Sequence, residues 1–274
     1  MTAFSDSETG RAVNRVTQVS LRELGHPAEP SDTHVVGEVL ELDHLRGPMG
    51  NVRAGALLTM ADTVGGMCSG LAVLPGWVVS TNLMLSTAPV APPAGHRGPF
   101  ALDARILRAG RNAVVTQVEI RDAGSRDQLV ADGVLTSAVL EPAGGPPDFP
   151  RPMVLAAPGG TDPVLPLLEF FGIRAHSDTA VALDIADRVR NPWGILHGGA
   201  TAVLVDAAAT HAVGERATAT DVVMHFLRPG RVGPAVARTT VIGHRPDGHV
   251  VRVEVVDAGA DDRVMAVAVV TVRP

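Results

Sequence analysis

Two aspartates stand in the middle of long apolar segments. Asp62 lies in "RAGALLTMADTVGG" (53–66), and Asp206 lies in "HGGATAVLVDAAAT" (197–210). A buried carboxylate costs free energy unless it is paired or hydrogen-bonded. If the two aspartates are purely structural, each is expected to bond to a backbone group or to a Ser or Thr side chain. The catalytic interpretation makes the carboxylate a general base or a nucleophile.

The two segments are copies of one another. They align without gaps at an offset of 144 residues, which places Gly55 on Gly199 and Asp62 on Asp206. Internal repeats of this kind indicate repeated structural units. Because the carboxylate recurs at the same register, the repetition favours a role for the pair over an accidental buried charge.

The spacing separates each aspartate from the start of its own helix. Asp206 follows Gly199 by seven residues, which is about two turns, or roughly 10 Å along an α-helix. Two such helices packed antiparallel would place the aspartate of one beside the N-terminus of the other. We therefore expect two crossed sites, one joining residues 197–199 to Asp62 and one joining residues 53–55 to Asp206.

Similar elements surround both segments. The sequence of each half predicts a strand, a long helix and then four antiparallel strands. The strands are indicated by runs in which apolar and polar residues alternate, separated by turn signals. Each helix is apolar nearly all round, so one sheet cannot cover it and the other half must. This pattern predicts an intrachain pseudo-dimer, with strands over 33–43, 77–86, 99–109, 112–122 and 128–140, and over 179–187, 217–227, 234–244, 249–258 and 263–272.

Length and composition set the domain organisation. The 274 residues suit one large domain or two domains of ordinary size, and the Pro- and Gly-rich stretch between the repeats predicts a linker. We expect an N-terminal domain at 1–140, a linker at 141–160 and a C-terminal domain at 161–274. The net charge of −6 gives no support for a nucleic-acid partner. A single cysteine and the lack of a signal core or membrane span predict a cytoplasmic protein.

The repeat and its motif resemble a known fold. The pattern resembles the hotdog fold, and the second half is similar to the phenylacetic-acid-pathway (PaaI-like) acyl-CoA thioesterases. The second half carries that motif as an Asn, a His-Gly-Gly-Ala that opens the helix, and an Asp nine residues after the His; these are Asn191, His197, Gly198, Gly199, Ala200 and Asp206. The first half departs from the motif, because Arg53 and Ala54 replace His and Gly, and Gly47 replaces Asn.

The resemblance implies an α+β double hotdog, in which two antiparallel sheets each wrap a central helix. It implies an enzyme, an acyl-CoA thioesterase, which needs no metal and no cofactor beyond the coenzyme A of its substrate. Asn191 and the amide of Gly199, or that of Gly198, would polarise the thioester carbonyl. Asp62 would be the general base, with a nucleophilic role as the alternative. Ser80 or Thr81 would orient the water or the carboxylate.

The second crossed site retains less of the motif. It keeps Gly55 and Asp206, and since a backbone amide does not depend on the side chain, its activity stays open. Arg53 is interpreted as a solvated or salt-bridged arginine, with contact to an anionic part of the ligand as the alternative. His197 is interpreted as structural, fixing its loop through a ring hydrogen bond, and Trp193 as a packing residue or part of an acyl pocket.

Two other functions fit a double hotdog. One is a non-catalytic protein that binds acyl-CoA as a sensor or carrier. The other is an enoyl-CoA hydratase, which needs an Asp and His pair that neither helix shows. Single-domain relatives form dimers of dimers, so the resemblance implies a homodimer of these tandem chains. The sequence does not identify the acyl group.

Overall fold

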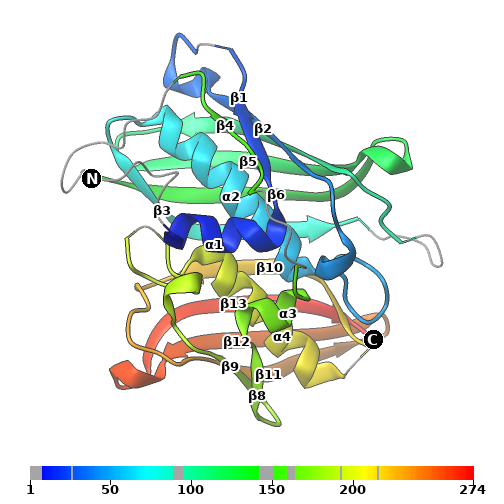
Figure 1. Ribbon diagram of the computed structural model, residues 1–274. Helices are drawn as coiled ribbons and strands as arrows, with labels where there is room; N and C mark the ends of the chain where they lie inside the picture. Colours follow the sequence, from blue (N-terminus) through cyan, green and yellow to red (C-terminus); the bar gives the residue numbers. More distant parts are fainter. Residues whose placement is uncertain are drawn as a thin grey trace.

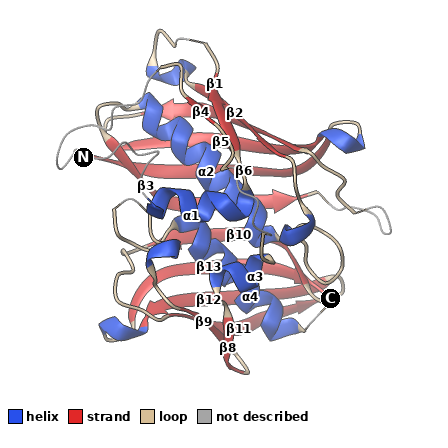
Figure 2. Cartoon of the chain, viewed as in Figure 1, coloured by secondary structure: helices blue, strands red, loops and turns tan. Residues whose placement is uncertain are grey.

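Each half of the chain wraps an antiparallel sheet around one long apolar helix, as Figures 1 and 2 show. The structure is a computed structural model that describes residues 8–25, 27–88, 95–141, 151–158, 164–191, 193–214 and 216–274. The central helices are α2 (Ala54–Ala72) and α4 (Gly198–Val213). This arrangement confirms the predicted α+β double hotdog, with one unit in each half.

The strands of the two halves follow the same order. In the first half the sheet order is β1-β2-β4-β5-β6-β3, and in the second it is β8-β9-β11-β12-β13-β10 when read from the opposite edge. The strands are β1 (Ser20–Glu23), β2 (His34–Val39), β3 (Trp77–Thr87), β4 (Phe100–Ala109), β5 (Ala113–Asp122), β6 (Gln128–Leu140), β8 (Arg174–Ser177), β9 (Ala180–Leu183), β10 (Thr218–Phe226), β11 (Ala235–Arg245), β12 (Gly248–Asp257) and β13 (Arg263–Arg273).

The sheets of the two halves join edge to edge, which the pseudo-dimer prediction did not specify. Strand β3 pairs antiparallel with β10, with Ser86 opposite Asp221 and Asn82 opposite His225. Each of these strands would otherwise leave an edge of unpaired backbone groups, and their pairing satisfies both edges at once. The result is one continuous 13-stranded sheet that curves around both helices.

The central helices pack antiparallel with their backbones in close contact. A Cβ atom added to Gly55 would lie 2.8 Å from the Cα of Val203, and one added to Gly199 would lie 2.6 Å from Cγ2 of Thr59. Only glycine allows this approach, because it has no side chain to collide with the neighbouring helix. The contact brings the start of each helix beside the middle of the other (Figure 1).

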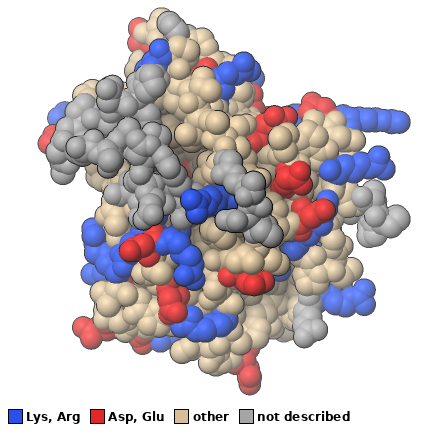
Figure 3. Space-filling view, viewed as in Figure 1, with Lys and Arg blue, Asp and Glu red and all other residues tan. Residues whose placement is uncertain are grey.

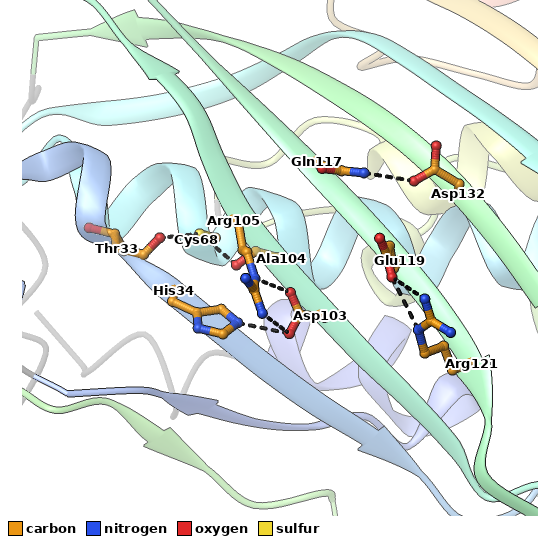
Figure 4. Close-up of polar contacts among 10 residues, drawn as sticks. All are labelled: Thr33, His34, Cys68, Asp103, Ala104, Arg105, Gln117, Glu119, Arg121 and Asp132. Atoms are coloured by element: carbon orange, nitrogen blue, oxygen red, sulfur yellow. Dashed lines mark hydrogen bonds and ion pairs between the residues drawn. The ribbon is translucent and has the colours of Figure 1, made fainter. Parts of the chain in front are cut away.

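The outer face of the first sheet is polar. Along β4, Leu102 and Ala104 are buried against α2, whereas Asp103 and Arg105 alternate with them onto the opposite face. Figure 4 shows Asp103 bonded to His34 and Arg105, beside the Glu119–Arg121 pair. These ion pairs are partly exposed and contribute little to stability. Figure 3 shows basic and acidic side chains interspersed over the face in view.

Several described elements lie outside the predicted pattern. They are the helices α1 (Glu8–Thr17) and α3 (Leu167–Phe171), the strand β7 (Val154–Leu155), and 3₁₀ turns at Pro30–Asp32, Asp43–Leu45, Ala123–Ser125, Asp187–Val189 and Ala258–Ala260. Strands β1 and β8 were not predicted either. None of the helices in the described ranges is long and apolar enough to cross a membrane.

The predicted linker, residues 141–160, is partly structured. Strand β7 pairs with β1, with Leu155 opposite Leu21, and thereby extends the first sheet. The buried carboxylate of Glu23 forms an ion pair with Arg151 and accepts a 2.9 Å hydrogen bond from the amide of Met153. Residues 151–155 are thus fixed on the first half, whereas residues 142–150 and 159–160 lie outside the described part of the chain.

Candidate active site

Asp62 lies in the middle of α2 and faces the start of α4. Its side chain is nearly buried, and its Oδ1 accepts a 2.6 Å hydrogen bond from Oγ of Ser80 on β3. A Cβ atom added to Gly198 would lie 2.7 Å from Oδ2 of Asp62. The structure therefore brings together Asp62, Ser80 and Gly198, with one carboxylate oxygen held and the other directed at the helix terminus.

His197 caps α4. Its Nδ1 accepts a 2.9 Å hydrogen bond from the amide of Gly199. The nitrogen that accepts this bond carries no proton, so the neutral ring is protonated on Nε2. Burial lowers the pKa of His197 below 6.5, although the carboxylate of Asp62 opposes that effect. Nδ1 lies 3.6 Å from Oδ2 of Asp62, and in a neutral ring both atoms are acceptors, so they do not bond to each other.

The cap corrects one expectation. The amide of Gly199 donates to the ring of His197, so it is not free to polarise a substrate carbonyl. The amide of Gly198 is the first of the helix and has no acceptor within the helix. Gly198 lies at the surface of the cavity described below. Of the two amides, that of Gly198 is therefore the one that the cap of α4 leaves without a helix acceptor.

Asn191 stabilises its own loop and faces the same cavity. Its Oδ1 accepts hydrogen bonds from the amides of Trp193 (3.0 Å) and Ile195 (3.3 Å). These contacts fix the orientation of the side-chain amide, so that oxygen and nitrogen cannot exchange places without losing them. The Nδ2 group is the donor of this side chain, and Asn191 lines the cavity.

A cavity of about 560 Å³ unites these groups. Its polar part contains Asp62, Ser80, Thr81, Asn191 and Gly198. A volume of this size is typical of a small-molecule site. Its remaining wall is mostly apolar and includes Met67, Leu71, Leu74, Trp77, Trp193, Ile195 and Phe226.

Thr81 and Trp193 line this cavity in different ways. The hydroxyl of Thr81 donates to the carbonyl of Thr136 on the neighbouring strand, so its hydrogen bond serves the sheet. The ring of Trp193 packs edge-on against that of Trp77, with centroids 4.1 Å apart. Trp193 therefore both packs and forms part of the cavity wall, which joins its two predicted roles.

The second crossed site is filled by an ion pair. The Nε of Arg53 lies 2.8 Å from Oδ2 of Asp206, and Nη2 donates a 3.1 Å hydrogen bond to Thr210. The side chains of Arg53 and Asp206 are only 10% and 2% exposed. Arg53 is therefore salt-bridged, as in the first of the two interpretations. Gly55 faces Asp206 here, as Gly198 faces Asp62.

Comparison with known proteins gives one match to a family model, within the second half of the chain. Residues 187–273 match the family model described as "Acyl-CoA thioesterase N-terminal domain". These residues include α4 and the strands β10 to β13 of the second hotdog unit. The protein is accordingly a thioester hydrolase that acts on acyl thioesters. No curated protein matches the chain in sequence. Within the described residues, no group of three or more His, Cys, Asp or Glu is arranged to hold a metal ion.

Solved structures share the tandem architecture. A tesB protein from Mycobacterium avium subspecies paratuberculosis is 11% identical, with 97% of this chain and 99% of that one covered and a TM-score of 0.59. The 12:0-ACP thioesterase from Umbellularia californica is 11% identical, with coverages of 88% and 94% and a TM-score of 0.61. An acyl-ACP thioesterase from Bacteroides thetaiotaomicron is also 11% identical, with coverages of 88% and 98% and a TM-score of 0.59. At this identity the likeness establishes the fold alone.

Some residues around the cavity were missed from the sequence. Arg228 and Arg231, in the segment after β10, line the cavity and are exposed to solvent. Both arginines belong to the segment "HFLRPGRVG" (225–233), and nothing in its sequence indicates that they face the site. Val13 of α1 and Leu155 of β7 also line the cavity, and both belong to elements that have no counterpart in the repeat pattern.

Proposed function

We propose that the protein is an acyl-CoA thioesterase with its active site at Asp62 and the start of α4. One observation carries this proposal: Oδ2 of Asp62 and Gly198, the first residue of α4, lie side by side in the wall of one largely apolar cavity. Hydrolysis of a thioester needs a base for water and donors for the developing oxyanion. Both requirements are met there by groups from opposite halves of the chain.

The proposed reaction begins with a water molecule on Oδ2 of Asp62. Asp62 removes one proton as the water oxygen attacks the carbonyl carbon, and the carbonyl oxygen becomes negatively charged. The amide of Gly198, at the positive end of the α4 dipole, and Nδ2 of Asn191 donate hydrogen bonds to that oxygen. The carbon–sulfur bond then breaks, the thiolate of coenzyme A takes the proton from Asp62, and the free acid leaves.

Ser80 and His197 act indirectly in this scheme. The Ser80 hydroxyl holds Oδ1 of Asp62 and so directs Oδ2 toward the cavity. His197 holds the first turn of α4 through its ring and thereby fixes the position of the Gly198 amide. Both are positioning residues, and a nucleophilic role for Asp62 remains the alternative within the same geometry.

The choice of coenzyme A rests on two arginines. Arg228 and Arg231 line the same cavity and are solvent-exposed, where they suit the phosphates of coenzyme A. Acyl carrier protein is the substrate carrier named for two of the similar structures, and its larger surface would have to dock over this edge. We favour coenzyme A because the arginines line the cavity itself.

The second crossed site is proposed to be inactive. A buried ion pair occupies the position at which a substrate carbonyl would have to meet the amides at the start of α2. Displacing Arg53 would leave Asp206 buried and uncompensated, which costs several kcal/mol. One active site per chain follows.

We also propose that the chain forms a homodimer and belongs to the PaaI-like group. The group assignment rests on the motif from Asn191 to Asp206 in the second half. For the dimer, three apolar side chains lie in register across the seam of the sheet: Met84 is opposite Val223, and Val223 is opposite Val269. They are 40%, 37% and 45% exposed, and a second copy of the chain would cover them.

Hydrolysis of acyl-CoA by the purified protein, followed by release of free thiol, tests the proposal. Turnover by the wild-type chain that is lost with Asp62→Asn supports it. Binding of acyl-CoA without thiol release would favour the sensor or carrier function instead. Single turnover in ¹⁸O-labelled water separates the two roles of Asp62. If Asp62 is a general base, the labelled water oxygen enters the free acid in the first turnover. If Asp62 is a nucleophile, the first free acid carries an unlabelled oxygen from the Asp62 carboxylate.

A further inference from the structure

One face of α2 carries a furrow that leads away from Asp62. Gly66 and Gly70 follow Asp62 at intervals of four residues, so all three lie on the same face of the helix, and all three line the cavity. A Cβ atom added to Gly66 would have no other atom within 4 Å, and one added to Gly70 would meet only Cγ2 of Val78 at an ordinary 3.6 Å. The helix surface is therefore open along this line.

Apolar side chains flank the furrow. Met67, Leu71 and Leu74 come from α2 and the turn after it, and Trp77 and Val78 come from the start of β3. Val13 of α1, Leu21 of β1 and Leu155 of β7 line the cavity as well. The segment leading to β7 contacts the end of α2, where Arg151 donates a hydrogen bond to the carbonyl of Leu71. A cavity with a carboxylate and amide donors at one end and such a wall beyond is suited to an aliphatic chain attached to a reactive carbonyl.

The far wall is rigidly attached to the first half. Leu21 and Leu155 face each other in the β1–β7 pair. Glu23, at the end of β1, holds Arg151 and the amide of Met153, and Arg151 also donates to the carbonyl of Leu71 at the end of α2. Because this wall is tied to both β1 and α2, it limits the length of any chain that enters the furrow.

We propose that this furrow is the acyl-chain subsite and that Gly66 and Gly70 set the preference for a linear chain of medium length. The inference rests on the proposed function. Gly70 follows Asp62 by eight residues, which is about 12 Å along the helix. An extended chain advances about 1.2 Å per bond, so the furrow holds about eight to ten carbons.

Substitution at Gly66 tests the subsite in the full-length protein. Gly66→Leu fills open space, so it leaves the fold intact but blocks the furrow about one turn from Asp62. With substrates from acetyl-CoA to myristoyl-CoA, the wild type should be most active on octanoyl- or decanoyl-CoA. Gly66→Leu should lower kcat/KM for decanoyl-CoA at least about tenfold, with a progressively smaller loss as the acyl chain becomes shorter. Gly66→Ala should show a smaller change in the same direction.

The neighbouring glycine is the matched control. A Cβ atom on Gly65 would lie 3.0 Å from side chains of Leu135 and Val118, on the face of α2 that meets the sheet. Gly65→Ala should therefore lower the melting temperature without changing the preference for chain length. Gly66→Ala should retain or raise the melting temperature, because alanine favours the helix over glycine.

Binding separates this inference from the proposed function. Non-hydrolysable alkyl-CoA thioethers, measured by calorimetry, report on the furrow whether or not the thioester is cleaved. Weaker binding of decyl-CoA but not of methyl-CoA by Gly66→Leu supports the subsite even if the wild type hydrolyses nothing, an outcome that would overturn only the proposed function. An unchanged chain-length profile would overturn the subsite, and equal loss for every thioether and for free coenzyme A would assign the furrow to the coenzyme instead.

Discussion

At the scale of single residues, His197 makes the start of α4 sensitive to pH. Its neutral Nδ1 caps the helix, and its pKa in the folded protein lies below 6.5 because of burial. The unfolded chain therefore takes up the proton more readily than the folded one. The contribution of His197 to the free energy of unfolding is fully present above about pH 6.5 and is lost as the pH falls from there through the lower pKa of the folded protein. His197→Asn keeps a capping acceptor that does not titrate.

The pH dependence is measured by urea unfolding of both proteins between about pH 5 and 8. The difference between the urea midpoints of the wild type and His197→Asn should fall as the solution is acidified. The other titrating groups are the same in both proteins, so their effects cancel in this difference. A difference that is independent of pH would contradict the proposed cap. A difference that rises on acidification would mean that the ion pair with Asp62 outweighs the cap.

Ser80 supplies the second prediction at this scale. Removing its hydroxyl leaves Oδ1 of Asp62 without its 2.6 Å donor, and the carboxylate is then free to turn. Ser80→Ala should lower kcat roughly tenfold while KM changes little, because a hydrogen bond to a charged group is worth about 1.5–3 kcal/mol. Thr81→Val is the matched control, since the Thr81 hydroxyl bonds to the sheet. Equal effects of the two substitutions would count against a positioning role for Ser80.

Spacing alone predicts which residues of the site meet, but not which of their atoms are free. The two-turn separation of Gly199 and Asp206 indicates crossed partners, and the structure brings Asp62 to Gly198 and Asp206 to Gly55. The amide of Gly199 was assigned to the substrate because a sequence does not reveal the rotation of the His197 ring. The partner of Arg53 depends likewise on side-chain geometry across the helix contact.

At the scale of elements, the buried Arg53–Asp206 pair joins α2 to α4. Replacing one member alone leaves the other charge buried, so Asp206→Ala should lower the free energy of unfolding by about 3 kcal/mol. The double substitution Arg53→Met with Asp206→Leu removes both charges and should recover much of that loss. Chemical denaturation of the wild type, the single variant and the double variant measures these free energies of unfolding. Additive losses in the double variant would contradict a coupled pair.

The repeated elements could be predicted from the sequence and the added ones could not. Apolar helices and alternating strands carry strong periodic signals, and the four strands after each helix are found close to their predicted ranges. Strands β1, β7 and β8 have only four, two and four residues, too few for a periodic signal, and the ten-residue helix α1 contains few apolar residues. The seam between β3 and β10 also escaped prediction, because edge pairing depends on how the two halves meet and not on the pattern within either half.

At the scale of the whole molecule, the exposed apolar row at the seam of the sheet predicts self-association. The chain has a mass of 28.4 kDa, so sedimentation equilibrium should give about twice that value. Val223→Arg places a charge in the middle of the row and should shift the protein toward a single chain. A wild-type protein that sediments as one chain across the micromolar range would exclude the homodimer.

The most direct measurement compares the two equivalent carboxylates. Asp62→Asn should reduce kcat for acyl-CoA hydrolysis by about 10²–10⁴-fold, the usual contribution of a general base. Arg53→Gln combined with Asp206→Asn, an uncharged pair of similar shape at the equivalent position, should retain nearly full activity per folded molecule. If Asp62→Asn hydrolyses acyl-CoA at the wild-type rate, or if the second variant loses as much activity as the first, a single active site built on Asp62 is wrong.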